Sequence, residues 1–275
     1  MILVDLHTHS TCSDGTVSPQ RLVELACRSS VAVLSLTDHD SVEGVPSFLA
    51  ACQRHGVRGL AGVELSAEFP STMHILGYGF DPGHAGFLHK LNDIRTMRNQ
   101  RNYKIIDRLR SIGVDLSMEE VQAYSGGTVV ARPHLARAMV ERGYCATMRE
   151  CFDRYLKRGA PGYVPRVRLS PQECIELIRS AGGLAVLAHP IQTARDIGDL
   201  RPIVKNLKDM GLWGLECVSA HHSPEWVFRY MELAGELGLF PTAGSDFHGA
   251  NRPGVSLGVL VDDDFLPWAR LGVSL

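Results

Sequence analysis

Residues 1–10, MILVDLHTHS, place two histidines at the end of a short apolar run. The run is typical of a buried β-strand, in which successive side chains point to opposite faces. Asp5, His7 and His9 therefore share one face. Because two imidazoles on one face can bind the same ion, this stretch predicts a strand that ends at a metal site.

The same combination, an apolar run followed by a metal-ligand residue type, recurs along the whole chain. Asp246 and His248 follow the run at 238–240, and His189 ends the segment LAVLAHP. A fold that brings these strand ends together collects imidazoles and carboxylates at one point, and such a cluster binds divalent metal. The predicted ligands are His7, His9, Asp14, His39, Glu64, His74, His189, Asp246 and His248.

Strand-like and helix-like segments alternate on both sides of a central region. A serine followed by proline at 18–19 and the capping box Ser170-x-x-Glu173 mark helix starts between predicted strands. Alternating units of this kind predict an α/β fold with a parallel sheet, and barrels place their chemistry at the carboxyl ends of the strands. Strands are expected at 3–6, 31–36, 59–65, 184–188, 212–218 and 239–243.

The central region has helical patterns and no convincing strand. We expect a helical insertion at 86–163 that lies beside or over the mouth of a barrel formed by 1–85 and 164–275. Residues 95–168 carry fifteen Lys or Arg against seven Asp or Glu, a net of +8, which leaves the remainder of the chain at −10. The near-neutral net charge of −2 is therefore the sum of an acidic metal-binding body and a basic insertion.

The basic insertion favours an anionic substrate, because arginine donates paired hydrogen bonds to phosphate oxygens. Arg132 and His134 follow a glycine-containing stretch at 126–131 and enter a predicted helix, so their side chains and the first helical amides can face one anion. Lys104 is a further candidate for binding substrate. Most of the other charges are expected to be solvated faces of helices.

Composition excludes several other classes of protein. At 275 residues the chain is long enough for one large barrel with an insertion, and it contains no run of about 20 apolar residues. Its seven cysteines show no C-x-x-C spacing, which indicates reduced thiols. No basic and apolar leader precedes His7, so we expect a cytoplasmic protein with no membrane contact and no evident protein partner.

The ordered motifs HTHS, SDG, TDHD, GVE, the isolated His74, AHP and SDFH resemble the PHP (polymerase and histidinol phosphatase) domain of the amidohydrolase superfamily. The resemblance covers residues 1–80 and 165–262. It implies a distorted (β/α)7 barrel with an inserted helical cap and three metal ions. One ion would be bound by His7, His9, Glu64 and Asp246, a second by Glu64, His74 and His189, and a third by Asp14, His39 and His248.

Asp14 is a departure from the family pattern, because some relatives carry histidine in this loop. Asp38 and Asp40 flank His39 and are expected to orient the ligands. A set of imidazoles and carboxylates favours manganese, with iron or zinc as alternatives.

The inserted segment resembles that of a subgroup that removes the 3′-phosphate from nucleoside 3′,5′-bisphosphates or trims short RNA from its 5′ end. The leading expectation is therefore a phosphatase that acts on a small nucleotide such as adenosine 3′,5′-bisphosphate. A metal-bridging hydroxide would attack phosphorus, and His221 or His222 would protonate the leaving oxygen.

Four alternatives stay open. The chain could be a 5′-3′ exonuclease on short RNA or other oligonucleotides, although its acidic remainder argues against binding long duplexes. It could be a histidinol-phosphate phosphatase, which shares the barrel ligands. It could hydrolyse C–N bonds as other amidohydrolases do, or it could be an inactive module, for which a ligand should be missing.

Overall fold

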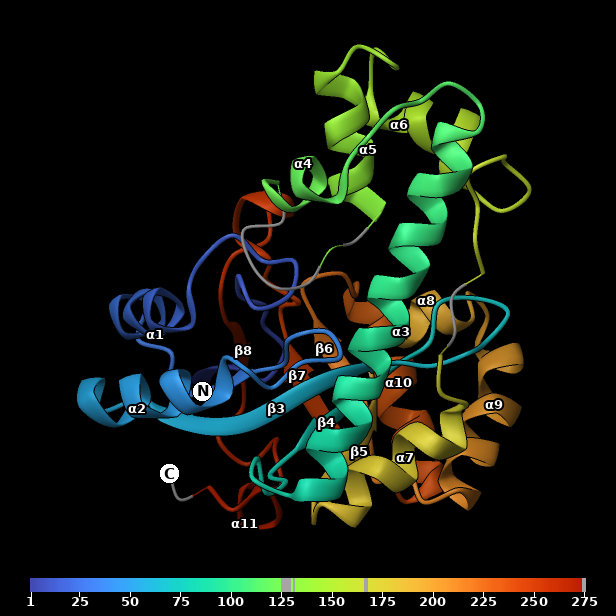
Figure 1. Cartoon of the computed structure of the whole chain (residues 1–275). Coiled ribbons are helices and arrows are strands. Elements are labelled where there is room, and N and C mark those ends of the chain that lie inside the picture. Colours follow the sequence, from blue (N-terminus) through green and yellow to red (C-terminus); the bar gives the residue numbers. More distant parts are fainter. Residues whose placement is uncertain (125–129, 131, 166–167, 274–275) are drawn as a thin grey trace. The chain divides into compact units, whose positions relative to one another are not determined.

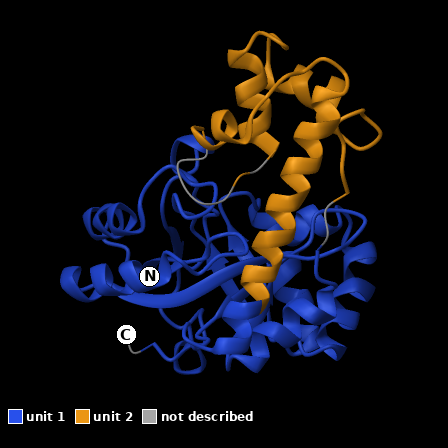
Figure 2. Cartoon of the chain, in the orientation of Figure 1, with its two compact units in different colours: residues 1–89, 168–275 blue, residues 90–167 orange. Residues whose placement is uncertain are grey.

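The computed structural model describes residues 1–124, 130, 132–165 and 168–273. The chain divides into two compact units, shown in Figure 2. Unit 1 consists of residues 1–89 and 168–275, and unit 2 consists of residues 90–167.

Unit 1 is built on a sheet of eight strands in the order β7-β6-β5-β4-β3-β2-β1-β8 (Figure 1). The strands are β1 (Ile2–Asp5), β2 (Val33–Leu36), β3 (Arg58–Ser66), β4 (His74–Tyr78), β5 (Leu184–Leu187), β6 (Gly214–Ser219), β7 (Phe240–Gly244) and β8 (Val259–Val261). Each of the six predicted strands is present, with ends that differ by a few residues. Strands β4 and β8 were not predicted.

The sheet curls so that β7 returns to β1. The amide of Leu6 donates to the carbonyl oxygen of Ala243 (3.0 Å), and the amide of Asp246 donates to that of His7 (2.9 Å). Strand β8 pairs antiparallel with β1 outside this ring of seven strands. The predicted distorted (β/α)7 barrel is therefore confirmed, with one added strand.

Strand β4 is the main distortion of the barrel. It runs antiparallel to both β3 and β5, whereas β1, β2 and β3 pair in parallel, as do β5, β6 and β7. Only seven residues, 67–73, separate β3 from β4. A parallel crossover needs about a dozen residues or more, so this connection folds back as a hairpin. The amino end of β4 therefore lies beside the carboxyl ends of its neighbours.

The helices of unit 1 pack on the outside of the sheet. Helices α1 and α2 pack on each other, with α1 against β2 and α2 against β3, while α10 packs on β6 and β7. Helix α7 begins where the sequence predicted, because the side chains of Ser170 and Glu173 form the capping box. The helices are α1 (Pro19–Arg28), α2 (Val45–His55), α7 (Pro171–Ser180), α8 (Pro190–Thr193), α9 (Ile197–Asp209), α10 (Pro224–Leu237) and α11 (Trp268–Leu271).

Unit 2 is helical in the part that the structure describes. Its core contains Ile105, Leu109, Val121 and Leu135, all fully buried. Burying each such aliphatic side chain contributes about 1.5–3 kcal/mol, so this unit has a core of its own. Its helices are α3 (Ala85–Arg110), whose first residues belong to unit 1, α4 (Met118–Gln122), α5 (Arg132–Glu141), α6 (Met148–Cys151) and the π-helix η1 (Phe152–Leu156).

No described helix of either unit combines the length and the apolar character that crossing a membrane requires.

Candidate metal centre

Strand direction explains why residues far apart in sequence meet at one end of the barrel. His7 and His9 follow β1, and His189 and Asp246 each lie two residues beyond a parallel strand. His74 is the first residue of β4, and because β4 is reversed, that residue also lies at this end. The nine predicted ligands therefore come together, although the prediction assumed parallel strands throughout.

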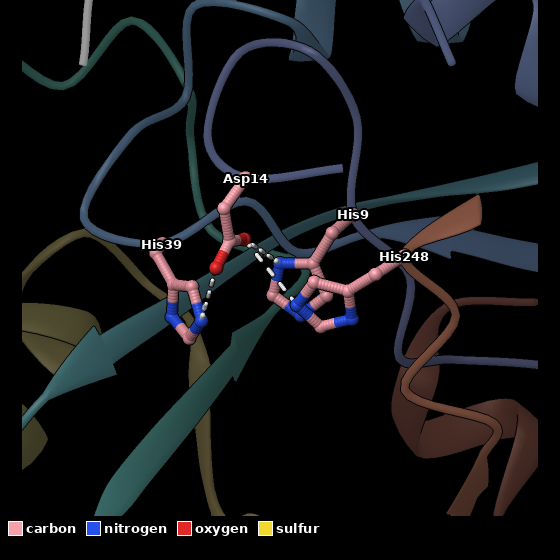
Figure 3. A group of neighbouring side chains, drawn as sticks. All are labelled: His9, Asp14, His39 and His248. Carbon is pink, nitrogen blue, oxygen red and sulfur yellow. Dashed lines mark ion pairs between the residues drawn. The ribbon is translucent and has the colours of Figure 1, made fainter. Parts of the chain in front are cut away.

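One group of these side chains surrounds the carboxylate of Asp14 (Figure 3). Its oxygens lie 3.3 Å from His248 Nε2 and 3.8 Å from His39 Nε2. The rings of His9 and His248 stack with centroids 4.0 Å apart. Asp14, the departure from the family pattern, thus lies where it could share an ion with the neighbouring histidines.

Asp246 belongs to a second group. Its Oδ1 atom lies 3.5 Å from His7 Nε2 and 3.4 Å from His9 Nε2. His9 Nδ1 lies 3.5 Å from the hydroxyl oxygen of Ser13, which leaves Nε2 facing His7 and Asp246. Three ligand-type atoms therefore converge at distances that a divalent ion bridges.

Glu64, on β3, lies at the centre of the cluster and is fully buried. Its Oε1 atom is 2.8 Å from His74 Nδ1 and 3.0 Å from His189 Nε2. Its Oε2 atom is 2.9 Å from His39 Nδ1 and 3.2 Å from His9 Nε2. Each carboxylate oxygen faces a different set of imidazoles, which is the arrangement that a carboxylate bridging two ions requires.

The buried polar atoms show that the site fits divalent metal. Buried polar atoms in proteins nearly always have a hydrogen-bond partner, and an exception calls for an explanation such as an ion. Divalent ions that accept nitrogen and oxygen ligands provide that explanation here. Within the described residues, six atoms of the cluster make no hydrogen bond of ordinary geometry, although several face one another at short distances: His7 Nε2, His9 Nε2, His39 Nδ1, Glu64 Oε2, His189 Nδ1 and His248 Nε2.

Charges in the cluster divide the histidines into two kinds. Burial lowers the pKa of His9, but the nearby carboxylates of Asp246 and Glu64 outweigh burial and raise it to about 10. Burial dominates at His74 and lowers its pKa to about 4. A metal ion that binds here at neutral pH must therefore displace protons from histidines such as His9.

Glu216, on β6, orients two of the ligands and was missed by the sequence analysis. Its carboxylate lies 2.8 Å from His7 Nδ1 and accepts the backbone N–H of His189 at 2.6 Å. In the neutral form of His7 this contact favours the ring proton on Nδ1, which leaves Nε2 facing the cluster as an acceptor. The available signal was a single acidic residue inside the apolar run at 212–218.

Asp5 and Asp38 hold the backbone that carries the ligands. Asp5 accepts the N–H of His7 (3.2 Å) and both the N–H and hydroxyl of Ser245 (2.8 and 2.6 Å), which joins the ends of β1 and β7. Asp38 accepts the N–H and hydroxyl of Ser10 (2.8 and 2.6 Å) and the hydroxyl of Ser13 (2.5 Å). These bonds fix the loop that ends at Asp14.

Backbone strain accompanies the site. Asp40, His189 and Asp246 have φ values of 50°, 26° and 60°, in a region that residues other than glycine rarely adopt. Each amide is held by a hydrogen bond: Asp40 to the Glu64 carbonyl (2.9 Å), His189 to Glu216 and Asp246 to the His7 carbonyl. A residue in such a conformation costs about 1–3 kcal/mol.

The two predicted acids occupy different surroundings. His221 Nε2 lies 3.9 Å from Asp246 Oδ2, at the edge of the cluster. His222 Nδ1 lies 3.0 Å from the carbonyl oxygen of Cys217, and its ring packs against Tyr230. His221 therefore lies beside the predicted ligand Asp246, whereas His222 contacts β6 and α10 and interacts with Glu216 and His189 only through their charge.

Arg252 is a second residue that the sequence analysis missed. Its guanidinium donates to Asp246 Oδ2, and it lies 3.4 Å from His221 Nε2. Asp246 thus presents one oxygen to Arg252 and the other to His7 and His9. An arginine in an exposed loop has no sequence signal that separates it from a solvated one.

The predicted substrate-binding residues lie in unit 2. Arg132 is the first residue of α5, and its guanidinium donates to the carbonyl oxygen of Leu156 at 3.3 Å. His134 is half-buried, and Lys104 is exposed on α3. Most of the stretch predicted to lead into α5, residues 126–129 and 131, lies outside the described residues.

A barrel that gathers six histidines and three carboxylates at the end where its parallel strands terminate defines a metal-dependent hydrolase. The family model of the PHP domain matches residues 5–161. The chain is 32% identical over 260 residues to a 3′,5′-nucleoside bisphosphate phosphatase from Chromobacterium violaceum, covering 94% of this chain and 91% of that protein. This protein belongs to the PHP domain family.

Two further comparisons cover almost all of the chain. A 5′-3′ exoribonuclease, Rnm, from Salmonella typhimurium is 33% identical over 277 residues, covering 100% of this chain and 89% of that protein. A solved structure of an amidohydrolase from Chromobacterium violaceum with bound sulfate and no metal superposes with a TM-score of 0.83 at 32% identity. It covers 98% of this chain and 95% of that one.

Proposed function

We propose that this protein is a metal-dependent phosphatase that removes the 3′-phosphate from nucleoside 3′,5′-bisphosphates such as adenosine 3′,5′-bisphosphate. The observation that carries the proposal is the convergence of five histidines on the buried carboxylate of Glu64, at 2.8–3.4 Å. The name of the Chromobacterium violaceum phosphatase supports the choice of substrate. The products would be a nucleoside 5′-monophosphate and inorganic phosphate.

The proposed centre holds three ions, with manganese favoured and iron or zinc as alternatives. Several distinct groups of ligand-type atoms, among them the Asp14 group and the Asp246 group, support more than one ion, and the two faces of Glu64 support a bridging role. We assign His7, His9, Glu64 and Asp246 to one ion, Glu64, His74 and His189 to a second, and Asp14, His39 and His248 to a third.

Divalent ions, when bound here, lower the pKa of coordinated water towards 7 and neutralise charge on a phosphoryl group. The chain's own side chains hold and orient the ligands and move the remaining proton. His221 is the better placed of the two candidate acids, because its Nε2 atom lies beside Asp246. It would protonate the leaving ribose oxygen.

The basic insertion is proposed to bind the anionic substrate through Arg132, His134 and Lys104. Its net charge of +8 between residues 95 and 168 supports this role. Arg132→Ala should lower activity on the preferred substrate and leave the metal content unchanged, whereas His7→Ala should deplete metal. We propose no protein partner and no binding to long duplex nucleic acid, since the remainder of the chain carries −10.

A second candidate function is 5′-3′ exonuclease activity on short RNA. The identity to the Salmonella typhimurium exoribonuclease over the whole chain favours it. Both activities place a phosphate ester at the same metal centre, so their substrates differ in the part that is attached to the reacting phosphate.

A cytoplasmic location is part of the proposal. All seven cysteines are free thiols, and five of them are buried. Reduced thiols without a disulfide are typical of a reducing compartment.

One experiment separates these functions. The purified protein is analysed for bound metal, reconstituted with manganese, and assayed for phosphate release from adenosine 3′,5′-bisphosphate and histidinol phosphate and for nucleotide release from a short 5′-phosphorylated RNA. The bisphosphate should be turned over with the highest kcat/KM. A fully metal-loaded protein that releases no phosphate from any bisphosphonucleotide contradicts the proposed function.

A further inference from the structure

A cavity of about 630 Å³ lies in unit 1. Its lining combines one cation, two neutral polar side chains and two apolar ones: Arg195, Thr72, Gln192, Ile191 and Trp226. Pockets that bind small molecules have volumes of about 300–1,000 Å³ and a similar mixture of apolar walls and a few polar groups.

The lining segments adjoin residues of the metal centre. Thr72 lies two residues before His74, and Ile191 lies two residues after His189. The backbone N–H of Gln192 donates to the carbonyl oxygen of His189 at 2.9 Å. The cavity is therefore formed by the loops at the ligand-bearing end of β4 and β5, next to the proposed reaction centre.

Hydrogen bonds hold two walls of the cavity together. The hydroxyl of Thr193 donates to the carbonyl oxygen of Thr72 at 3.1 Å, and the hydroxyl of Ser71 donates to the carbonyl oxygen of Thr193 at 2.6 Å. Thr193 is buried, at 4% exposure. These bonds connect the loop before β4 to helix α8 and so join two walls of the cavity.

Trp226 forms an anchored apolar wall on the first turn of α10. Its ring stacks on Tyr230 with centroids 5.4 Å apart, and the Arg229 guanidinium lies 5.4 Å from the ring centroid. Ile191 is half-buried on the lining of the same cavity. An aromatic and an aliphatic wall suit the sugar and base of a nucleotide better than a bare inorganic anion.

Arg195 gives the cavity its charge. Among the described residues, no carboxylate pairs with its exposed guanidinium, while the adjacent Asp196 caps α9 by accepting the Gly198 N–H at 2.7 Å. An arginine with free donors at the rim of a cavity can bind a phosphate through two parallel hydrogen bonds.

We infer that this cavity is the subsite for the part of the substrate that does not react, with Arg195 binding the 5′-phosphate of a nucleoside 3′,5′-bisphosphate. The inference rests on the proposed function and names what lies beyond the reacting 3′-phosphate. Thr72 and Gln192 would contact the sugar, and Trp226 would lie along the base. Recognition of the second phosphate here would favour a bisphosphate over a 3′-monophosphate.

The test compares two substrates that differ by the 5′-phosphate. Wild type, Arg195→Gln and the control Arg201→Gln, which removes an equal charge from α9 outside the cavity, are assayed on adenosine 3′,5′-bisphosphate and on adenosine 3′-monophosphate. Arg195→Gln should lower kcat/KM for the bisphosphate about tenfold or more and leave that for the monophosphate unchanged. Equal effects on both substrates, or no effect, would overturn the inference.

Calorimetric binding of adenosine 5′-monophosphate separates failure of the subsite from failure of the proposed function. Wild type and Arg201→Gln should bind this nucleotide, and Arg195→Gln should bind it about tenfold more weakly or worse. This outcome would support the subsite even if the wild-type protein hydrolysed no bisphosphate. Equal binding by all three proteins, or no binding by wild type, would reject the subsite while leaving the phosphatase activity to be judged by turnover.

Discussion

Replacing Glu216 by glutamine should weaken metal binding without touching any proposed ligand. The carboxylate contacts His7 Nδ1 at 2.8 Å and accepts the His189 N–H at 2.6 Å, both in the buried interior. Glutamine has one side-chain oxygen, so its NH₂ group must face one of these two donors. A hydrogen bond to a charged group contributes about 1.5–3 kcal/mol, and its loss corresponds to a Kd about 10- to 150-fold higher.

Part of that loss is offset at neutral pH. Burial lowers the pKa of His7, but Glu216 is the strongest of the carboxylates that outweigh burial and raise it. Removing this charge makes His7 easier to deprotonate, and a proton on His7 competes with metal. We therefore expect a net increase in Kd of about 10- to 100-fold, the range usual for partners of metal-binding histidines.

The assay is manganese binding by calorimetry, combined with metal analysis after dialysis against graded chelator. Glu24→Gln is the matched control, because Glu24 is a half-buried acid on α1 that pairs with Arg21 and is not among the predicted ligands. Circular dichroism checks that both variants are folded. A folded Glu216→Gln protein that retains metal as tightly as Glu24→Gln would refute the argument that Glu216 orients the ligands.

Four further predictions follow from the site. Removing metal with a chelator should lower the Tm by several degrees, and adding manganese should restore it, since a ligand at 100 times its Kd stabilises the folded state by about 2.7 kcal/mol. An unchanged Tm would argue against a metal in the folded protein. Because carboxylates raise the pKa of His9 to about 10, protons compete with manganese at neutral pH, and manganese affinity should rise with pH between about 6 and 9. The expected rise is about tenfold per pH unit for each proton displaced. A manganese affinity that calorimetry finds independent of pH would contradict this competition. Asp38→Asn should lower the free energy of unfolding by about 2–4 kcal/mol in urea titrations, because three buried hydrogen bonds to the loop before Asp14 depend on it; equal stability would mean that the loop is held otherwise. His221→Gln should reduce kcat about 100-fold or more at unchanged metal content, whereas His222→Gln should have little effect, and equal losses in the two would remove His221 from the proposed acid role.

The barrel could be predicted because its signals are local. Each parallel strand is an apolar run next to a helix with clear start signals, such as the capping box at Ser170. Strand β4 was missed because the alternating rhythm breaks there, with seven residues before it and the whole insertion after it. The short connection was a usable signal, since it is too short for a parallel crossover.

The predicted ligands could be named because the chemistry of a metal ligand restricts residue type. The residues that support them were harder to find. Glu216 and Arg252 act through partners that only the folded chain provides, namely the Nδ1 atom of His7 and the outer oxygen of Asp246. Likewise, no local pattern indicates that Arg195 and Trp226, 31 positions apart, line one cavity.

The positive φ angles of Asp40, His189 and Asp246 have a consequence for protein engineering. At about 1–3 kcal/mol each, these three positions together cost a substantial part of the free energy of unfolding, which is typically about 5–15 kcal/mol for a folded domain. Selection for heat resistance alone would therefore favour glycine at these three positions, and at His189 and Asp246 it would yield a more stable but inactive protein. A thermostable variant should instead be sought on the outer helices, with activity retained as a second criterion of selection.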